Sequence, residues 1–181
     1  MSIGTGSNVA VLSDVAFGSN PGMWPLPRAV TASELWLRAV AAAGQGRYSC
    51  ALADLDRLDR FADAGPLRAL GLSTRASFHR QLGWHDRARP LDGPALALAS
   101  GDAESGADAF IGLAADALGV GRFTASACAL ARASRLVDDA GAPRLPVRHA
   151  WVSAELAMVR GEGRSSVAHA DTALALADDF G

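Results

Sequence analysis

Apolar and polar positions along most of this chain follow the period of an α-helix. Between residues 48 and 58 the apolar side chains recur three or four positions apart, at Tyr48, Ala51, Leu52, Leu55 and Leu58. The same spacing recurs near the end of the chain, at Val147, Trp151, Ala154 and Met158. Such spacing places the apolar side chains on one face of a helix. No stretch shows the alternation of a strand, so the pattern predicts an all-α fold.

Glycines interrupt the helical runs at regular intervals. Breaks are expected near Gly46, Gly65, Gly83, Gly101, Gly121, Gly141 and Gly163. Four of these breaks begin similar short turns, which are Gly46-Arg47-Tyr48, Gly83-Trp84-His85, Gly121-Arg122-Phe123 and Gly163-Arg164-Ser165. Successive turns lie 37, 38 and 42 residues apart. Because glycine accepts the left-handed backbone that ends a helix, the spacing predicts a repeating unit of two helices joined by a turn.

The expected helices pair into four helical hairpins. Their ranges are 31–44 with 48–58, 67–82 with 86–99, 103–118 with 123–140, and 146–160 with 165–180. Thr31 and Glu34 have the spacing of a capping box, in which a hydroxyl and a carboxylate bind free amides at a helix start. Pro90 and Pro94 fall inside the range 86–99, so we expect that helix to begin late or to kink. The aromatic side chains expected in the core are Trp36, Phe78, Phe110 and Trp151.

Residues 1–30 differ in composition from the rest of the chain. Ser, Gly, Asn and Pro dominate there, and three prolines at 21, 25 and 27 disfavour helix. We therefore expect a flexible N-terminal leader over residues 1–30 and a helical repeat domain over residues 31–181. No basic residue precedes the apolar stretches of the leader, which argues against a secretory signal. A short motif that binds a partner is the alternative to a plain tail.

Composition and charge narrow the classes of function. With 50% hydrophobic residues among 181, the chain can bury a full core, and it lacks an apolar run as long as a transmembrane helix. A formal net charge of −2 gives no general attraction to nucleic acid or to an anionic membrane. Two cysteines make no disulfide framework, which favours a reducing cytoplasm. All 17 basic residues are Arg, which is typical of a GC-rich, actinobacterium-like source and excludes lysine-based catalysis.

The sequence contains no motif for catalysis or for metal binding. The residues that could ligate a metal lack the spacing of a metal site, and they are His79, His85, His149, His169, Cys50 and Cys128. The two cysteines fall among Ala and Leu and are expected to be inert apolar side chains. The carboxylates are scattered over the helix surfaces. We therefore expect a protein that is not an enzyme and uses no cofactor and no metal, with a degenerate enzyme as the least favoured alternative.

The first hairpin carries a recognisable pattern. Gly46, Tyr48 and Ala51 match in register the glycine, aromatic and small residue around the turn of the tetratricopeptide repeat (TPR). The later units keep part of this pattern, with Gly83 and Ala88, Gly121 and Phe123, and Gly163 and Ala168. The chain therefore resembles the TPR family over about residues 31–180, although its period exceeds the 34 residues usual in that family. The resemblance implies a right-handed α–α superhelix of about four helical hairpins that serves protein–protein interaction.

The resemblance also implies where a partner would bind. In the register of this family the first helix of each pair lines the inner surface, which places there Trp36, Ser73, Ser77, Arg80, Asp108 and Ser153. A protein or peptide segment is the expected partner, with Arg80 pairing with a carboxylate and Trp36 serving as an apolar anchor. The alternative is a ligand-sensing or regulatory domain, for example one related to transcription. A closed polar cavity would favour sensing, and an open apolar groove would favour protein recognition.

Two surface features suggest further contacts. Residues 66–90 carry five arginines and one acidic residue, a local excess that suits an anionic partner, with nucleic acid the less favoured one. The final helix from Ser165 is apolar on more than one side, whereas the outer helix of an array is usually polar. We therefore expect a homodimer through the C-terminal helices, with a longer natural chain or a folded-back leader as the alternatives.

Overall fold

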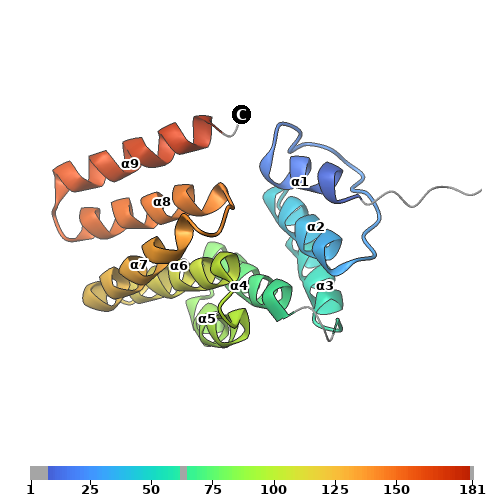
Figure 1. Cartoon of the computed structure of the whole chain (residues 1–181), viewed down its shortest axis with the longest axis horizontal. Coiled ribbons are helices and arrows are strands. Elements are labelled where there is room, and N and C mark those ends of the chain that lie inside the picture. The colour runs from blue at the N-terminus through green and yellow to red at the C-terminus, as the bar shows by residue number, and fades with distance from the viewer. Residues whose placement is uncertain (1–7, 62–64, 180–181) are drawn as a thin grey trace, which may run out of the picture.

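The computed structural model describes residues 8–61 and 65–179, and all regular secondary structure in these residues is helical. The helices are α1 (Val9–Phe17), α2 (Ala32–Gly44), α3 (Tyr48–Leu58), α4 (Gly65–Gln81), α5 (His85–Ala99), α6 (Ala103–Gly119), α7 (Phe123–Val137), α8 (Arg144–Val159) and α9 (Gly163–Asp178). Figure 1 shows α1 to α3 at one end of the molecule and α8 and α9 at the other. None of these helices has the length and apolar character needed to cross a membrane. The predicted all-α fold is confirmed for the described ranges.

Eight of the helices in these ranges pair into hairpins, α2 with α3, α4 with α5, α6 with α7 and α8 with α9. The same turn joins each pair. Its glycine has a φ between +75° and +78°, at Gly46, Gly83, Gly121 and Gly161. The amide of the next residue donates to a carbonyl five positions back, as Arg47 N does to Ala42 O at 2.8 Å. These are the bonds of a Schellman motif, and the positive φ is the reason that glycine stands there.

The fourth turn lies two residues before its predicted position. Gly161 takes the left-handed conformation, whereas Gly163 is the first residue of α9. In this register Ser166, and not Ala168, is the small residue that follows the turn. Its hydroxyl donates to Ala154 O at 3.0 Å. The equivalent residues of the other hairpins, Ala51, Ala88 and Ser126, are fully buried, so all three lie where their two helices approach closely.

The N-terminal segment differs from the flexible leader that the sequence predicted. Residues 9–17 form α1, which packs against α2 and buries Leu12 and Val15. The connection from α1 to α2 also lies on the domain, where Ala29 is fully buried. All three prolines of this segment follow α1, so they do not oppose that helix. Residues 1–7, the first part of the predicted leader, lie outside the described ranges.

Glu34 holds this segment against the start of α2. The predicted capping box is confirmed, since Thr31 Oγ1 accepts from Glu34 N at 3.2 Å and Glu34 Oε2 accepts from Thr31 N at 3.0 Å. The same carboxylate also accepts from Val30 N at 2.9 Å and from Asn8 N at 2.8 Å. These backbone hydrogen bonds lower the pKa of Glu34 to about 2. One buried side chain thus joins the start of α1 to the start of α2.

The buried apolar side chains gather in two clusters. One lies among α1 to α4 and contains Leu12, Leu35 and Leu58, and the other lies among α6 to α8 and contains Ile111 and Leu145. Residues of both clusters also border the groove described below. Packing of the hairpins therefore fixes the two sides of that groove.

Two predictions about side chains were wrong, and so was the late start, one of the two alternatives predicted for α5. Helix α5 begins at His85 and continues through Pro90 and Pro94, so it does not start late. Trp151 is 59% exposed, whereas Trp36 and Phe78 are buried as predicted. Cys50 and Cys128 are exposed thiols and not apolar packing residues.

Candidate functional site

A groove of about 570 Å³ runs along the first helices of the hairpins. Helices α2 and α8 form its sides, α4 and α6 lie between them, and the end of α1 adds Ala16 and Phe17. The lining contains more apolar than polar residues. The apolar ones with large side chains are Phe17, Trp36, Val40, Phe78, Ile111, Leu118, Trp151 and Val152.

One end of the groove, the charged end, lies at Arg144, and the groove leads from it toward Gly44 and Glu155. Trp36 and Arg144 lie near the N-terminal ends of α2 and α8 and contact each other, with Arg144 Cζ 5.2 Å from the centre of the indole ring. The lining then continues to Gly44 and Glu155, near the other ends of the same helices. The helix from Trp36 to Gly44 spans roughly 12 Å, because each residue adds about 1.5 Å. That length suits about four residues of an extended chain at roughly 3.3 Å each.

Arg144 closes the charged end of the groove. Its guanidinium donates to Asp108 Oδ1 at 2.7 Å and to Glu104 Oε1 at 2.8 Å. The same group lies 5.2 Å from the ring centre of Trp36 and 5.8 Å from that of Phe17, which are cation–π distances. A second cavity on the far side of these three residues is also lined by Arg144, Phe17 and Trp36. The arginine and the two rings therefore form the wall between the two cavities.

Asp108 anchors the arginines of α8 at the base of the groove. Its side chain is buried and accepts hydrogen bonds from Arg144 and from Arg148 Nη1. Burial alone would raise the pKa of Asp108, but attraction to Arg148 and Arg144, with a contribution from Ser73, lowers it below the usual 3.8. Asp108 therefore stays ionised and holds both guanidinium groups in place.

A second ion cluster lies under the groove, between α4, α5 and α6. Arg80 Nη1 donates to Asp92 Oδ2 at 2.6 Å and to Asp116 Oδ1 at 3.1 Å. Burial raises the pKa of Asp92 to about 7, and Asp116 adds to the rise while Arg80 opposes it. Asp92 lies against Gly112, where an added Cβ would stand 2.5 Å from Asp92 Oδ1. Glycine at this position thus leaves the space that the carboxyl group occupies.

Arg148 is the guanidinium best placed to meet a ligand in the groove. Its side chain is 29% exposed, compared with 13% for Arg144 and 11% for Arg80. Within the described ranges only its Nη1 makes a hydrogen bond, to Asp108. Burial, together with the charges of Arg144 and Arg80, lowers the pKa of Arg148, yet an arginine keeps its proton at neutral pH. Its remaining N–H groups can therefore donate to an acidic group.

The structure brings together four of the six residues predicted for the inner surface. Trp36, Ser77, Arg80 and Asp108 line the groove. Ser73 is fully buried beside Asp108, and Ser153 on α8 donates its hydroxyl to His149 O at 2.8 Å. The role expected for Arg80 does not fit its geometry, because Asp92 and Asp116 already bind its guanidinium. Sequence reasoning missed Arg148, which lies four residues after Arg144 on the same face of α8.

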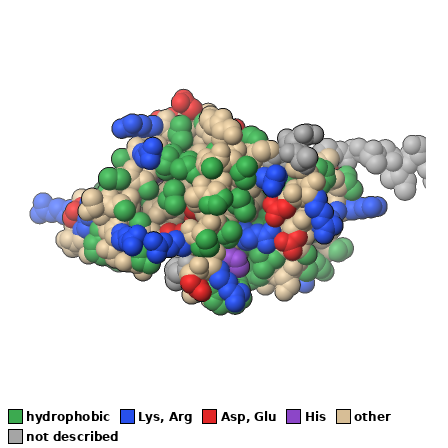
Figure 2. All heavy atoms as spheres, turned by 90° about the horizontal axis from the view of Figure 1, so that it is seen from below, with side chains coloured by type: hydrophobic (Ala, Val, Ile, Leu, Met, Phe, Trp, Pro, Cys, Tyr) green, Lys and Arg blue, Asp and Glu red, His purple; other side chains and the backbone are tan. Residues whose placement is uncertain are grey.

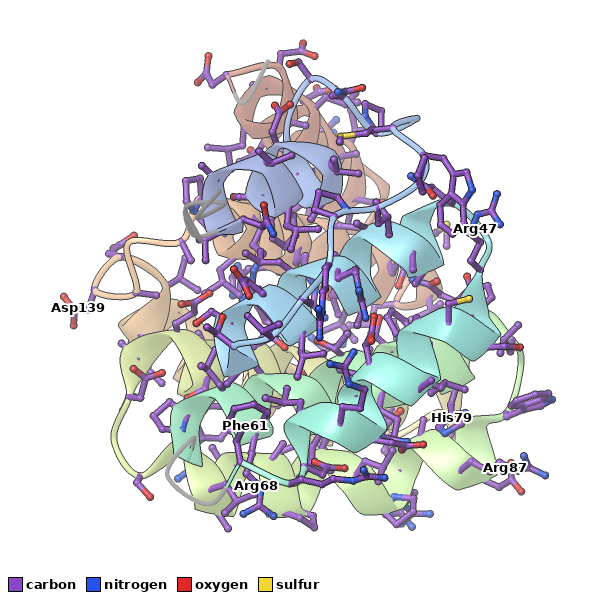
Figure 3. The ribbon with its side chains drawn as sticks, turned by 90° about the vertical axis from the view of Figure 1, so that its right-hand side faces the viewer. Arg47, Phe61, Arg68, His79, Arg87 and Asp139 are labelled. Atoms are coloured by element: carbon purple, nitrogen blue, oxygen red, sulfur yellow. The ribbon has the colours of Figure 1, made fainter. Side chains whose placement is uncertain are left out.

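The basic segment at 66–90 does not form one continuous patch. Arg75 pairs with Asp56 at 2.8 Å and with Asp59 at 3.3 Å, and Arg80 is held by the ion cluster under the groove. Figure 3 shows Arg68 and Arg87 far apart along the lower edge of the molecule. On the face seen in Figure 2 the basic side chains likewise lie in several separate groups. This arrangement gives no single broad basic surface.

The histidines and acidic groups do not come together as metal ligands. In residues 8–61 and 65–179, no group of three or more His, Cys, Asp or Glu side chains is arranged to hold a metal ion. His79 lies beside Trp84, with ring centres 5.8 Å apart, and Arg87 lies over the same indole. Burial and the charges of Arg75 and Arg87 lower the pKa of His79. The groove is therefore the strongest candidate site that the described residues offer.

Comparisons of the chain with protein-family models, with curated proteins and with solved structures give no match. The groove itself is the feature that indicates a function. Its size, its apolar sides and its charged end are the properties that a ligand must complement.

Proposed function

We propose that this chain is a binding module that takes a segment of a partner protein in the groove between α2 and α8. The observation that carries the proposal is the apolar groove of about 570 Å³ along the first helices of the hairpins. Apolar concave surfaces with a few convergent polar groups are typical of binding sites. The groove length of roughly four extended residues suits a short segment of chain.

The groove offers a partner two kinds of contact. Trp36 donates from Nε1 to Thr74 Oγ1 at 3.0 Å, which orients its ring beside the groove and satisfies its polar atom. Because Trp36 is buried against Phe17 and Arg144, the exposed ring of Trp151 in the same lining is the one that can pack against an apolar side chain of the partner. Arg148 has free N–H groups for an acidic group of the partner. These contacts support a segment that combines apolar and acidic side chains.

The proposal also covers the arrangement of the hairpins and the cellular role of the module. Four hairpins that share one turn support a TPR-like right-handed superhelix with the first helices on its inner surface. We include in the proposal a non-enzymatic scaffold role in the cytoplasm. In this role the hairpins hold the groove and the partner supplies the activity.

A groove-filling variant tests the proposal. Gly44 lines the groove, and a Cβ added there meets no atom within 4 Å, so Gly44→Leu should fill the groove without disturbing the fold. Gly93 on α5 is the matched control, because it is also a helical glycine with open space around it and lies outside the groove. We expect wild type and Gly93→Leu to capture the same proteins from a lysate of the source organism, and Gly44→Leu to lose at least one of them. Identical sets for all three proteins, measured by quantitative mass spectrometry, would contradict the proposal.

One observation favours a second candidate, the sensing of a small acidic molecule. The groove volume falls within the range of roughly 300–1,000 Å³ that is common for small-molecule sites. Native mass spectrometry of the purified protein distinguishes the two. A bound small molecule that Arg148→Ala releases would support sensing, whereas a protein released by Gly44→Leu would support the binding module.

A further inference from the structure

Helix α9 presents an apolar stripe to solvent. It packs on α8, and no residue described in α9 is buried. Val167 is 61% exposed and Leu174 is 65% exposed, and Ala170 and Ala177 share the same side of the helix because of their spacing. Figure 1 shows α9 along the outer edge of the molecule. The stripe is equivalent, through the register of the turns, to Ala127, Leu130, Ser134 and Val137 of α7.

That equivalence indicates what kind of element fits the stripe. On α7, Leu130 is 6% exposed and Val137 is 8% exposed. Helix α8 packs against α7, and His149 Nε2 lies 3.1 Å from Leu130 O. In the third hairpin the part of this face at Leu130 and Val137 is therefore covered, whereas Ser134, the counterpart of Leu174, is exposed. On α9 all four positions of the stripe are apolar and exposed, so the stripe can receive a helix.

The charges of α9 run opposite to those that its own dipole favours. Arg164 lies in the first turn and Asp178 and Asp179 lie at the end, although a helix N-terminus attracts negative charge and a C-terminus attracts positive charge. In the described residues Arg164, Asp178 and Asp179 make no ion pair. The arrangement costs stability within one chain. It is complementary to a second α9 that runs in the opposite direction.

We propose that α9 packs antiparallel against α9 of a second copy of this chain. A two-fold axis near residue 171 places Val167 opposite Leu174 of the second copy and, at the same time, Arg164 opposite Asp178. The two-fold repeats each of these contacts, so one patch covers its own twin. The match of the apolar stripe and of the reversed charges to the same two-fold axis favours a second copy as the occupant.

The same geometry sets the strength of the contact. Asp171 of each copy lies near the axis, on the solvent edge of the stripe, and Glu162 precedes Arg164, so both oppose the attraction in part. The stripe is one helix wide and carries two small alanines, which is a narrow surface compared with the roughly 800 Å² per partner of a typical stable interface. The dimer is therefore weak, concentration-dependent and sensitive to salt.

Charge exchange between two variants tests the proposal. Arg164→Asp alone and the double variant Asp178→Arg, Asp179→Arg alone should each be monomers, because each places like charges opposite one another. An equimolar mixture of the two should form dimers again, since every reversed residue then faces its opposite. Sedimentation velocity over a concentration series, at low salt, measures all three samples and the wild type. Arg135→Asp, an exposed change on α7, is the control that should associate like wild type.

The outcomes separate the possibilities. Antiparallel α9 pairing would be supported if the wild type and the mixture form dimers while each variant alone stays monomeric. A wild type that stays monomeric at every concentration would overturn the proposal and leave a different partner for the stripe. Dimers that persist in both variants, or a mixture that stays monomeric, would overturn it as well. Circular dichroism melting of each variant confirms that the fold is intact, which is expected because the changed side chains are exposed.

Discussion

The pKa of Asp92 lies further from its ordinary value than the position of this residue in the sequence suggests. Asp92 lies on α5 in a segment with two prolines, yet its carboxyl group is fully buried and bound by Arg80, against Asp116 and the backbone of Gly112. Nothing in the spacing of these residues predicts the cluster, because they belong to three helices that meet only in the folded chain. Buried ion clusters of this kind are costly to break and set the position of the arginine.

The raised pKa of Asp92 predicts that the protein loses stability as pH rises from about 4 to about 7. The folded state keeps the proton up to a pKa of about 7, whereas the unfolded state releases it near 3.8. Between these values the folded state binds more protons, so its free energy of unfolding falls as pH increases, by roughly 1–4 kcal/mol in total. Asp92→Asn cannot ionise and should lack this loss.

Urea unfolding of the wild type and Asp92→Asn at a series of pH values measures the effect. His79 titrates in the same window with the opposite sign, because its folded pKa is lowered. It is present in both proteins, so their difference isolates Asp92. Parallel curves for the two proteins would show that Asp92 is ionised throughout in the folded state.

A substitution at Ala51 tests the predicted register of the first hairpin. Ala51 is fully buried where α2 and α3 approach, next to the turn at Gly46. Ala51→Trp should lower the free energy of unfolding by about 1–3 kcal/mol or more, because a large side chain cannot fit there without strain. Ala53→Trp on the exposed side of the same helix is the matched control and should change stability little. Equal midpoints of thermal unfolding for the two variants would place Ala51 outside the close contact.

Among the elements, the paired helices were predictable and α1 was not. The glycines at 46, 83 and 121 marked the turns correctly because each needs a positive φ, a requirement that few other residues meet. The fourth turn was misplaced because Gly161 and Gly163 are both available, and only the backbone shows which of them is left-handed. Helix α1 was missed because its short apolar run is followed by a proline-rich connection, and its stability comes from contacts with α2.

Helix α1 should depend on Glu34. This carboxylate accepts backbone hydrogen bonds from Asn8, Val30 and Thr31, which join the start of α1 to the start of α2. Glu34→Gln should raise the hydrogen exchange of residues 9–17 while the amides of α6 and α7 keep their protection. Glu155→Gln, on the rim of the groove, is the control for loss of a negative charge.

The hydrogen bonds of Glu34 also predict that helix α1 loses protection at low pH. The pKa of Glu34 in the folded state is about 2, below its ordinary 4.5, so its contribution is present above pH 4.5 and is lost as pH falls toward 2. The protection factors of the α1 amides, which compare observed exchange with the intrinsic rate at each pH, should therefore fall in this range in the wild type and change less in Glu34→Gln. Protection of α1 that is equal in the two proteins at neutral pH would show that Glu34 does not hold the helix.

For the molecule as a whole, the helices that line the groove were predictable and the chemistry of the groove was not. Placing the first helix of each pair on the inside was enough to find Trp36, Ser77 and Asp108. Which arginine can bind a ligand depends on the ion pairs that form in the folded chain. The sequence therefore favoured Arg80, whereas Arg148 is the one with N–H groups left free to donate. Trp151 was expected in the core because its spacing matches buried positions, yet it stands at the open side of the groove.

Site-specific photo-cross-linking is the most direct test of a partner segment in the groove. A photoreactive phenylalanine analogue at Trp151 lies exposed in the groove lining, and the same analogue at Val120, 48% exposed and outside the lining, is the control. In cells of the source organism we expect a cross-linked protein at position 151 and none at position 120, and the added change Gly44→Leu should abolish the adduct. An adduct at 151 that survives Gly44→Leu, or equal adducts at both positions, would contradict binding in the groove.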